Sequence, residues 1–260
     1  MANIKIAVIN ESKAVTDKEV QTAVAALQKQ VTNDFAPVWG TDADLKFVPR
    51  TAQPAKGAWW LVILDNSDEA GALGYHDVTD EGLPLGKVFA GTDIQYKLSW
   101  TVTASHELLE MLGDPDVNLT AFVETKTGGT MYAYEVADAC EADEYGYKID
   151  GILVSDFVYP TWFESFHKAG TQYDHQKKIK KPFQLLPGGY IGKYDVKGGS
   201  WTQLNAEGTR LKYEMRPKVG SRRERRRTPR DQWIASSVTW ASRTMTSAPK
   251  AAKEREKEKV

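Results

Sequence analysis

Apolar and polar residues alternate along the first half of the chain in a pattern that predicts strands and helices in turn. IKIAVINE has an apolar residue at every second position, which is typical of a strand. TDKEVQTAVAALQKQVTNDF follows, with Thr16 or Asp17 as the expected cap and apolar residues at helical spacing: Val20, Val24, Leu27 and Val31. DLKFVPR predicts a second strand. The nearly continuous apolar run GAWWLVILDN predicts a central strand buried on both faces.

The pattern then changes to a polar segment followed by a helix. Residues 66–86 are polar and rich in glycine, and we expect a loop there. KVFAGTDI predicts a short strand. SWTVTASHELLEMLG predicts a helix, and Gly113 and Pro115 are the residues expected to stop it. The order strand, helix, strand, strand, strand, helix predicts an α+β fold. In it, a twisted mixed sheet is backed by one helix, with a second helix below it.

The second half of the chain predicts hairpins and short strands. Asp150-Gly151 stands between two apolar runs and is a strong hairpin signal. VYPTWFESF is interpreted as an aromatic hairpin that belongs to the core. Residues 182–216 contain several short aromatic strands or loops. The C-terminal half is thus expected to be rich in β-hairpins. We expect a domain over residues 1–165, an aromatic β/loop extension over 166–216 that packs on it, and an extended basic, charged tail over 217–260.

The predicted helix around residue 106 carries the strongest chemical signal. His106 and Glu110 are four residues apart, so both lie on one helix face and can bind one metal ion. Glu107 lies one residue further round, where it can take a proton from a water bound to that ion. The alternative is an ordinary helix whose carboxylates face solvent. Apolar residues surround these acids, which favours burial of the helix instead: Leu108, Leu109, Met111 and Leu112. Buried carboxylates need a partner, and a metal ion can be that partner.

The segment SHELLEMLGDP followed by EVADACE resembles a group of zincin-like proteins. These proteins pair an HExxE helix ending in Asp-Pro with a downstream E-[IV]-x-D-x-C segment, and the matching residues here are His106, Glu107, Glu110, Asp114, Pro115, Glu135, Asp138 and Cys140. The resemblance covers roughly residues 1–165. It implies a zincin-like fold and a metallopeptidase-like hydrolase with a zinc ion. Glu110 stands where true zincins have a second histidine, which makes a bound ion a weaker Lewis acid and favours harder ions such as Mn²⁺ or Ca²⁺.

The sequence leaves the third metal ligand open. Glu135 and Asp138 are the first choice, because the resemblance implies a ligand or an orienting carboxylate from a downstream segment. A solvated acidic loop is the competing interpretation of these two residues. Asp114 and Asp116 are the alternative ligands. Cys140 is interpreted as a small core residue rather than a soft ligand. His76 could line the cleft or lie on the surface.

Composition adds a charge asymmetry. The net charge is −1, yet residues 217–260 contain 13 Lys/Arg against 5 Asp/Glu. We expect this tail to bind an acidic protein surface or a neighbouring copy of the chain, with nucleic acid as the alternative partner. A solvated, disordered tail is the competing interpretation. Cys140 is the only cysteine, so no intrachain disulfide is expected. With no apolar run of about 18 residues and no signal-like start, we expect no membrane segment. The expected location is the cytoplasm or an assembled particle such as a virion.

Two functions are compatible with these observations. The first is a metal-dependent peptidase or amide hydrolase in which His106, Glu110 and Glu135 or Asp138 hold the ion and Glu107 is the general base. The second is a catalytically silent zincin-fold structural protein of a large assembly, which docks through its basic tail.

Overall fold

The chain has a mixed α+β fold with several sheets and few helices. The computed structural model describes residues 4–68, 72–79, 81–126, 128–207 and 210–215, and the predicted tail over 217–260 lies outside this part of the chain. Within the described part, no helix is long and apolar enough to cross a membrane.

The first sheet is mixed and has the spatial order β2-β1-β3-β5-β4. Its strands are β1 (Ile4–Asn10), β2 (Ala43–Pro49), β3 (Trp59–Leu64), β4 (Gly74–Val78) and β5 (Pro84–Phe89). Four strands are parallel, and β4 pairs antiparallel with β5 at the edge. β3 is central and its residues 61–64 are buried, so the prediction of a strand covered on both faces is confirmed.

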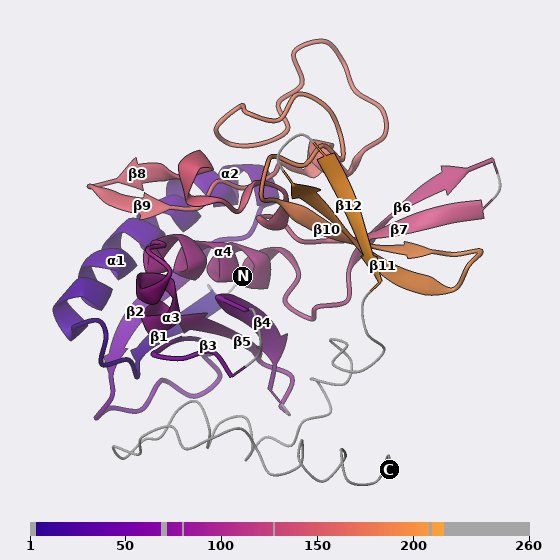
Figure 1. Ribbon diagram of the computed structural model, residues 1–260. Coiled ribbons are helices and arrows are strands. Elements are labelled where there is room, and N and C mark those ends of the chain that lie inside the picture. Colours follow the sequence, from indigo (N-terminus) through magenta and orange to yellow (C-terminus); the bar gives the residue numbers. More distant parts are fainter. Residues whose placement is uncertain (1–3, 69–71, 80, 127, 208–209, 216–260) are drawn as a thin grey trace, which may run out of the picture.

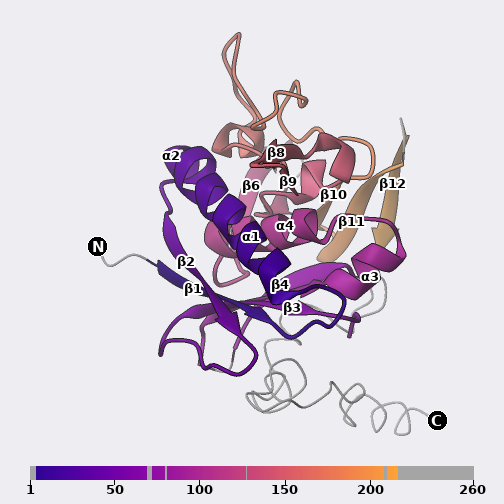
Figure 2. The same ribbon diagram turned by 90° about the vertical axis from the view of Figure 1, so that its left-hand side faces the viewer.

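Two helices, α1 and α4, cover one face of this sheet (Figure 2). α1 (Asp17–Lys29) begins at Thr16, whose side chain accepts from the N–H of Glu19 while the Glu19 carboxylate accepts from the N–H of Thr16. It continues as a π-helix, η1 (Gln30–Phe35), and a short helix, α2 (Ala36–Trp39). α3 (Ala90–Gln95) leads into α4 (Trp100–Gly113).

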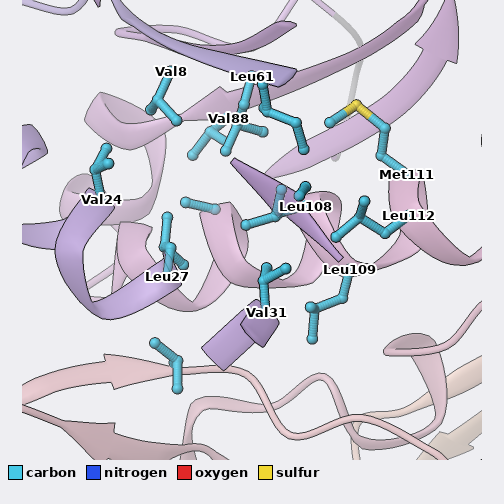
Figure 3. Packing of buried hydrophobic residues seen from close by; sticks show 14 of the residues in the cluster. Val8, Val24, Leu27, Val31, Leu61, Val88, Leu108, Leu109, Met111 and Leu112 are labelled. Atoms are coloured by element: carbon cyan, nitrogen blue, oxygen red, sulfur yellow. The ribbon is translucent and has the colours of Figure 1, made fainter. Parts of the chain in front are cut away.

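The main core lies between the sheet and these helices. Figure 3 shows Val8, Leu61 and Val88 of the sheet together with Val24 and Leu27 of α1, Val31 of η1 and the leucines of α4. α4 is apolar around most of its circumference, which is typical of a helix buried on all sides. Its other side packs against Val136, Val154 and Phe157. A hairpin of β8 (Tyr147–Ile149) and β9 (Ile152–Val154) therefore encloses α4 from above (Figure 1).

A second sheet, entirely antiparallel, has the order β12-β11-β10-β7-β6. Its strands are β6 (Thr120–Thr125), β7 (Gly128–Ala133), β10 (Tyr190–Asp195), β11 (Ser200–Glu207) and β12 (Arg210–Met215). Short 3-10 helices complete the chain: η2 (Asp138–Cys140), η3 (Asp143–Tyr145) and η4 (Pro160–Phe163). This sheet joins segments from both sides of residue 165.

Three local predictions need correction. The segment predicted as a loop over 66–86 contains β4, because Tyr75 and Asp77 make this edge strand look polar. KVFAGTDI is not a single strand: β5 begins at Pro84, and residues 90–95 form α3. VYPTWFESF is not a hairpin but contains η4. Trp162 and Phe163 are buried as expected of core residues, whereas Phe166, which follows η4, is exposed. The Asp150-Gly151 hairpin is confirmed, with positive φ at both residues.

Candidate metal centre

α4 places three ionisable side chains together. His106, Glu107 and Glu110 are 7, 5 and 3% exposed, although a charged group inside a protein is unfavourable without a partner. His106 Nε2 lies 3.2 Å from Glu110 Oε1, so the two residues share one helix face as the sequence predicts. None of the three side chains faces open solvent, which excludes the interpretation of α4 as a surface helix with solvated carboxylates.

β4 lies directly against this part of α4. Gly74 and His76 share the face of β4 that points toward the helix. A Cβ atom at Gly74 would stand 2.7 Å from Glu107 Oε1, so only glycine permits this approach. Two residues along, His76 is 5% exposed, and its Nδ1 lies 3.3 Å from Glu110 Oε2 and 3.6 Å from Glu107 Oε2. The edge strand therefore adds a second histidine to the cluster.

The segment that follows β7 supplies two further carboxylates. Glu135 and Asp138 are buried, and each faces a different histidine. Asp138 Oδ1 lies 3.3 Å from His106 Nε2, and Glu135 Oε2 lies 3.6 Å from His76 Nε2. A Cβ at Gly113 would meet Val136 Cγ1 at 2.8 Å, so the end of α4 packs tightly on this segment. The N–H of Ala137 also donates to Glu110 Oε1 at 3.4 Å.

Burial and mutual charge set the electrostatics of the cluster. Burial disfavours a charged His106, but Glu110 and Asp138 outweigh it and hold the pKa of His106 well above its usual range. Burial likewise opposes ionisation of Glu110, but His106 holds the pKa of that carboxyl well below its usual range. Burial and the Glu110 charge raise the pKa of Asp138 to about 7. The cluster thus attracts positive charge, which a proton on His106 or a metal cation can supply.

The remaining predicted residues lie in other surroundings. Asp114 is fully buried, and its carboxylate accepts the backbone N–H groups of Asn118 and Leu119, both at 3.0 Å. It closes the turn after α4 and is absent from the groups that can hold a cation among the described residues. Asp116 is exposed. Cys140 is buried in the apolar cluster beneath the second sheet, as expected of a core residue.

The described residues contain two groups whose chemistry fits a divalent cation. One is His106, Glu110 and Asp138, and the other is His76, Glu107 and Glu110; within each group the ligand atoms lie within 4.8 Å of one another. An imidazole nitrogen with two carboxylate oxygens is a donor set that Zn²⁺ accepts. Glu107 Oε2 is buried and accepts no hydrogen bond from the described residues, which is typical of an atom that has a further ligand.

The sequence leaves His76 open between the cleft and the surface, and the structure places it buried beside Glu110. Its signal was the alternation in GYHDV, where Gly74 and His76 fall on one face of the strand and Tyr75 and Asp77 on the other. Comparison of the chain with protein-family models, curated proteins and solved structures finds no match. The geometry of this cluster is therefore the main indication of function.

Proposed function

We propose that the protein is a zincin-like, metal-dependent peptidase or amide hydrolase. The supporting observation is the convergence of His106 Nε2, Glu110 Oε1 and Asp138 Oδ1 in a buried cluster on an HExxE helix. These three side chains would hold the cation. When bound, a divalent cation polarises a substrate carbonyl and lowers the pKa of a water molecule to about 7.

Glu107 would be the general base in this reaction. It follows His106 on α4, and its charge lies close enough to His106 to contribute to the raised pKa of that histidine. Its Oε2 atom would accept a proton from the attacking water and return it to the leaving amine. His76, whose Nδ1 is 3.6 Å from Glu107 Oε2, would orient this carboxylate.

Metal content and turnover of a Glu107→Gln variant test this function. Purified wild-type protein should retain a divalent cation by elemental analysis and should hydrolyse a fluorogenic peptide mixture. Glu107→Gln keeps the shape of the side chain but cannot accept a proton, so turnover should fall by about 10²-fold or more while the ion held by His106, Glu110 and Asp138 is retained.

The exposed Glu124 on β6 offers a matched control, because Glu124→Gln makes the same chemical change outside the cluster. This variant should turn over like wild type. Wild-type protein that binds no metal, or a Glu107→Gln variant with full activity, would contradict the proposed hydrolase.

A further inference from the structure

The two candidate metal groups share one residue, Glu110, through different oxygens. Glu110 Oε1 faces His106 Nε2 at 3.2 Å, whereas Glu110 Oε2 faces His76 Nδ1 at 3.3 Å. The two carboxylate oxygens carry separate lone pairs, and a carboxylate in this arrangement can bridge two cations. In sites with two metal ions, the ions generally lie about 3.5–4 Å apart. Glu110 therefore has the geometry of a bridging ligand between two positions.

The group around His76 has the features of a site in its own right. Nδ1 of His76 faces the carboxylates of Glu107 and Glu110, while Nε2 on the other side of the ring faces Glu135 Oε2 at 3.6 Å. A carboxylate behind a histidine orients the ring and makes the opposite nitrogen a better ligand. Glu107 contributes a buried oxygen, Oε2, that accepts no hydrogen bond from the described residues.

The charge of the cluster also favours more than one cation. Four buried carboxylates surround the two histidines: Glu107, Glu110, Glu135 and Asp138. One divalent cation held by His106, Glu110 and Asp138 balances the charge of Glu110 and Asp138 only. Glu107 lies on the side of His76, where a second cation would balance its buried charge.

We propose that His76, Glu107 and Glu110 bind a second divalent cation, and that this second ion inhibits the hydrolysis proposed above, on which the inference rests. The physical reason is that the lone pair of Glu107 then binds a cation and cannot accept a proton. The second ion enters beside the positive charge of the first, so it binds more weakly. Activity therefore rises as the first ion binds and falls as the second binds.

The test is a titration of metal-free, full-length protein with Zn²⁺, measured by calorimetry and by equilibrium dialysis. Wild-type protein should bind two ions per chain, the second more weakly. Hydrolysis of a fluorogenic peptide should appear with the first equivalent and fall by about 10²-fold or more as the second equivalent binds. His76→Ala should bind one ion, and its rate should show no fall at high zinc. His167→Ala, which changes an exposed histidine outside the cluster, should bind two ions and show the same fall as wild type.

Each outcome separates this inference from the proposed function. One ion per wild-type chain with hydrolysis intact would overturn the second site and leave the hydrolase standing. Two ions without any fall in rate would overturn the inhibition, and a chain that binds none would remove both. Wild-type protein loaded with Mn²⁺ gives a test that needs no variant. Two Mn²⁺ ions bridged by Glu110 should give an exchange-coupled electron paramagnetic resonance spectrum, whereas spectra of isolated ions would contradict the bridge.

Discussion

Replacing Gly74 by alanine should damage the contact between β4 and α4. The added Cβ would stand 2.7 Å from both Glu107 Oε1 and Thr103 Cγ2, closer than carbon and oxygen atoms approach without a shift of the backbone or side chains. Overpacking of a buried contact generally costs about 1–3 kcal/mol. The free energy of unfolding should therefore fall by about this amount, and the displaced Glu107 should lower peptide hydrolysis. Urea denaturation followed by tryptophan fluorescence measures the first effect, and turnover measures the second.

Gly192 of β10 offers the matched control. A Cβ at this position meets Ala133 Cβ at 3.5 Å and Trp201 Cζ3 at 3.9 Å, which are ordinary contacts. Gly192→Ala should leave the free energy of unfolding unchanged or raise it by about 0.4–1 kcal/mol, because alanine lowers the conformational entropy of the unfolded chain. If Gly74→Ala proved as stable and as active as Gly192→Ala, the described approach of β4 to Glu107 would be wrong.

Three further predictions concern buried polar groups. Ser105→Ala removes a hydroxyl that donates to Gln30 Oε1 at 2.6 Å and accepts from Ser155 N at 3.0 Å. Each buried group left unpaired costs about 1–3 kcal/mol, so urea denaturation should show that the free energy of unfolding falls by about 2–5 kcal/mol. A fall below about 0.5 kcal/mol would contradict this network. Burial and the Asp174 carboxyl raise the pKa of Asp156 to about 8, so the folded protein keeps a proton that the unfolded chain releases near 3.8. The free energy of unfolding should therefore fall as pH rises from about 4 to about 8. Urea denaturation at about pH 4 and about pH 8 should show a smaller fall for Asp156→Asn than for wild type, because the variant lacks the titrating carboxyl. Asp114→Ala should cost about 1–3 kcal/mol in the same urea assay, yet zinc content should be unchanged; a loss of zinc would place Asp114 in the metal centre.

The sequence predicts those parts of the fold whose patterns are local. Thr16 and Glu19 form a capping box three residues apart, and the apolar run of β3 needs no distant information to be recognised as a buried strand. The Asp150-Gly151 turn is likewise determined by two adjacent residues. His106 and Glu110 belong to the same class, because the helical repeat alone brings them to one face.

The parts that the sequence does not predict depend on tertiary contacts. His76 looks like a residue of a polar loop until β4 pairs with β5, and only the glycine at 74 lets this strand approach α4. Asp114 and Asp138 cannot be ranked from spacing. In the structure, the Asp114 carboxylate accepts two backbone N–H groups of the turn after α4. The packing of Gly113 on Val136 positions the segment that carries Asp138.

The central claim is that His106, Glu110 and Asp138 hold a metal cation. Anomalous diffraction at the zinc absorption edge, from crystals grown with zinc, tests it most directly. We predict an anomalous peak within coordination distance of His106 Nε2 and of the Glu110 and Asp138 carboxylates, about 2.0–2.2 Å from each ligand atom. Crystals of zinc-treated protein without anomalous density at these side chains, and with His106 still paired directly with Glu110, would contradict the account.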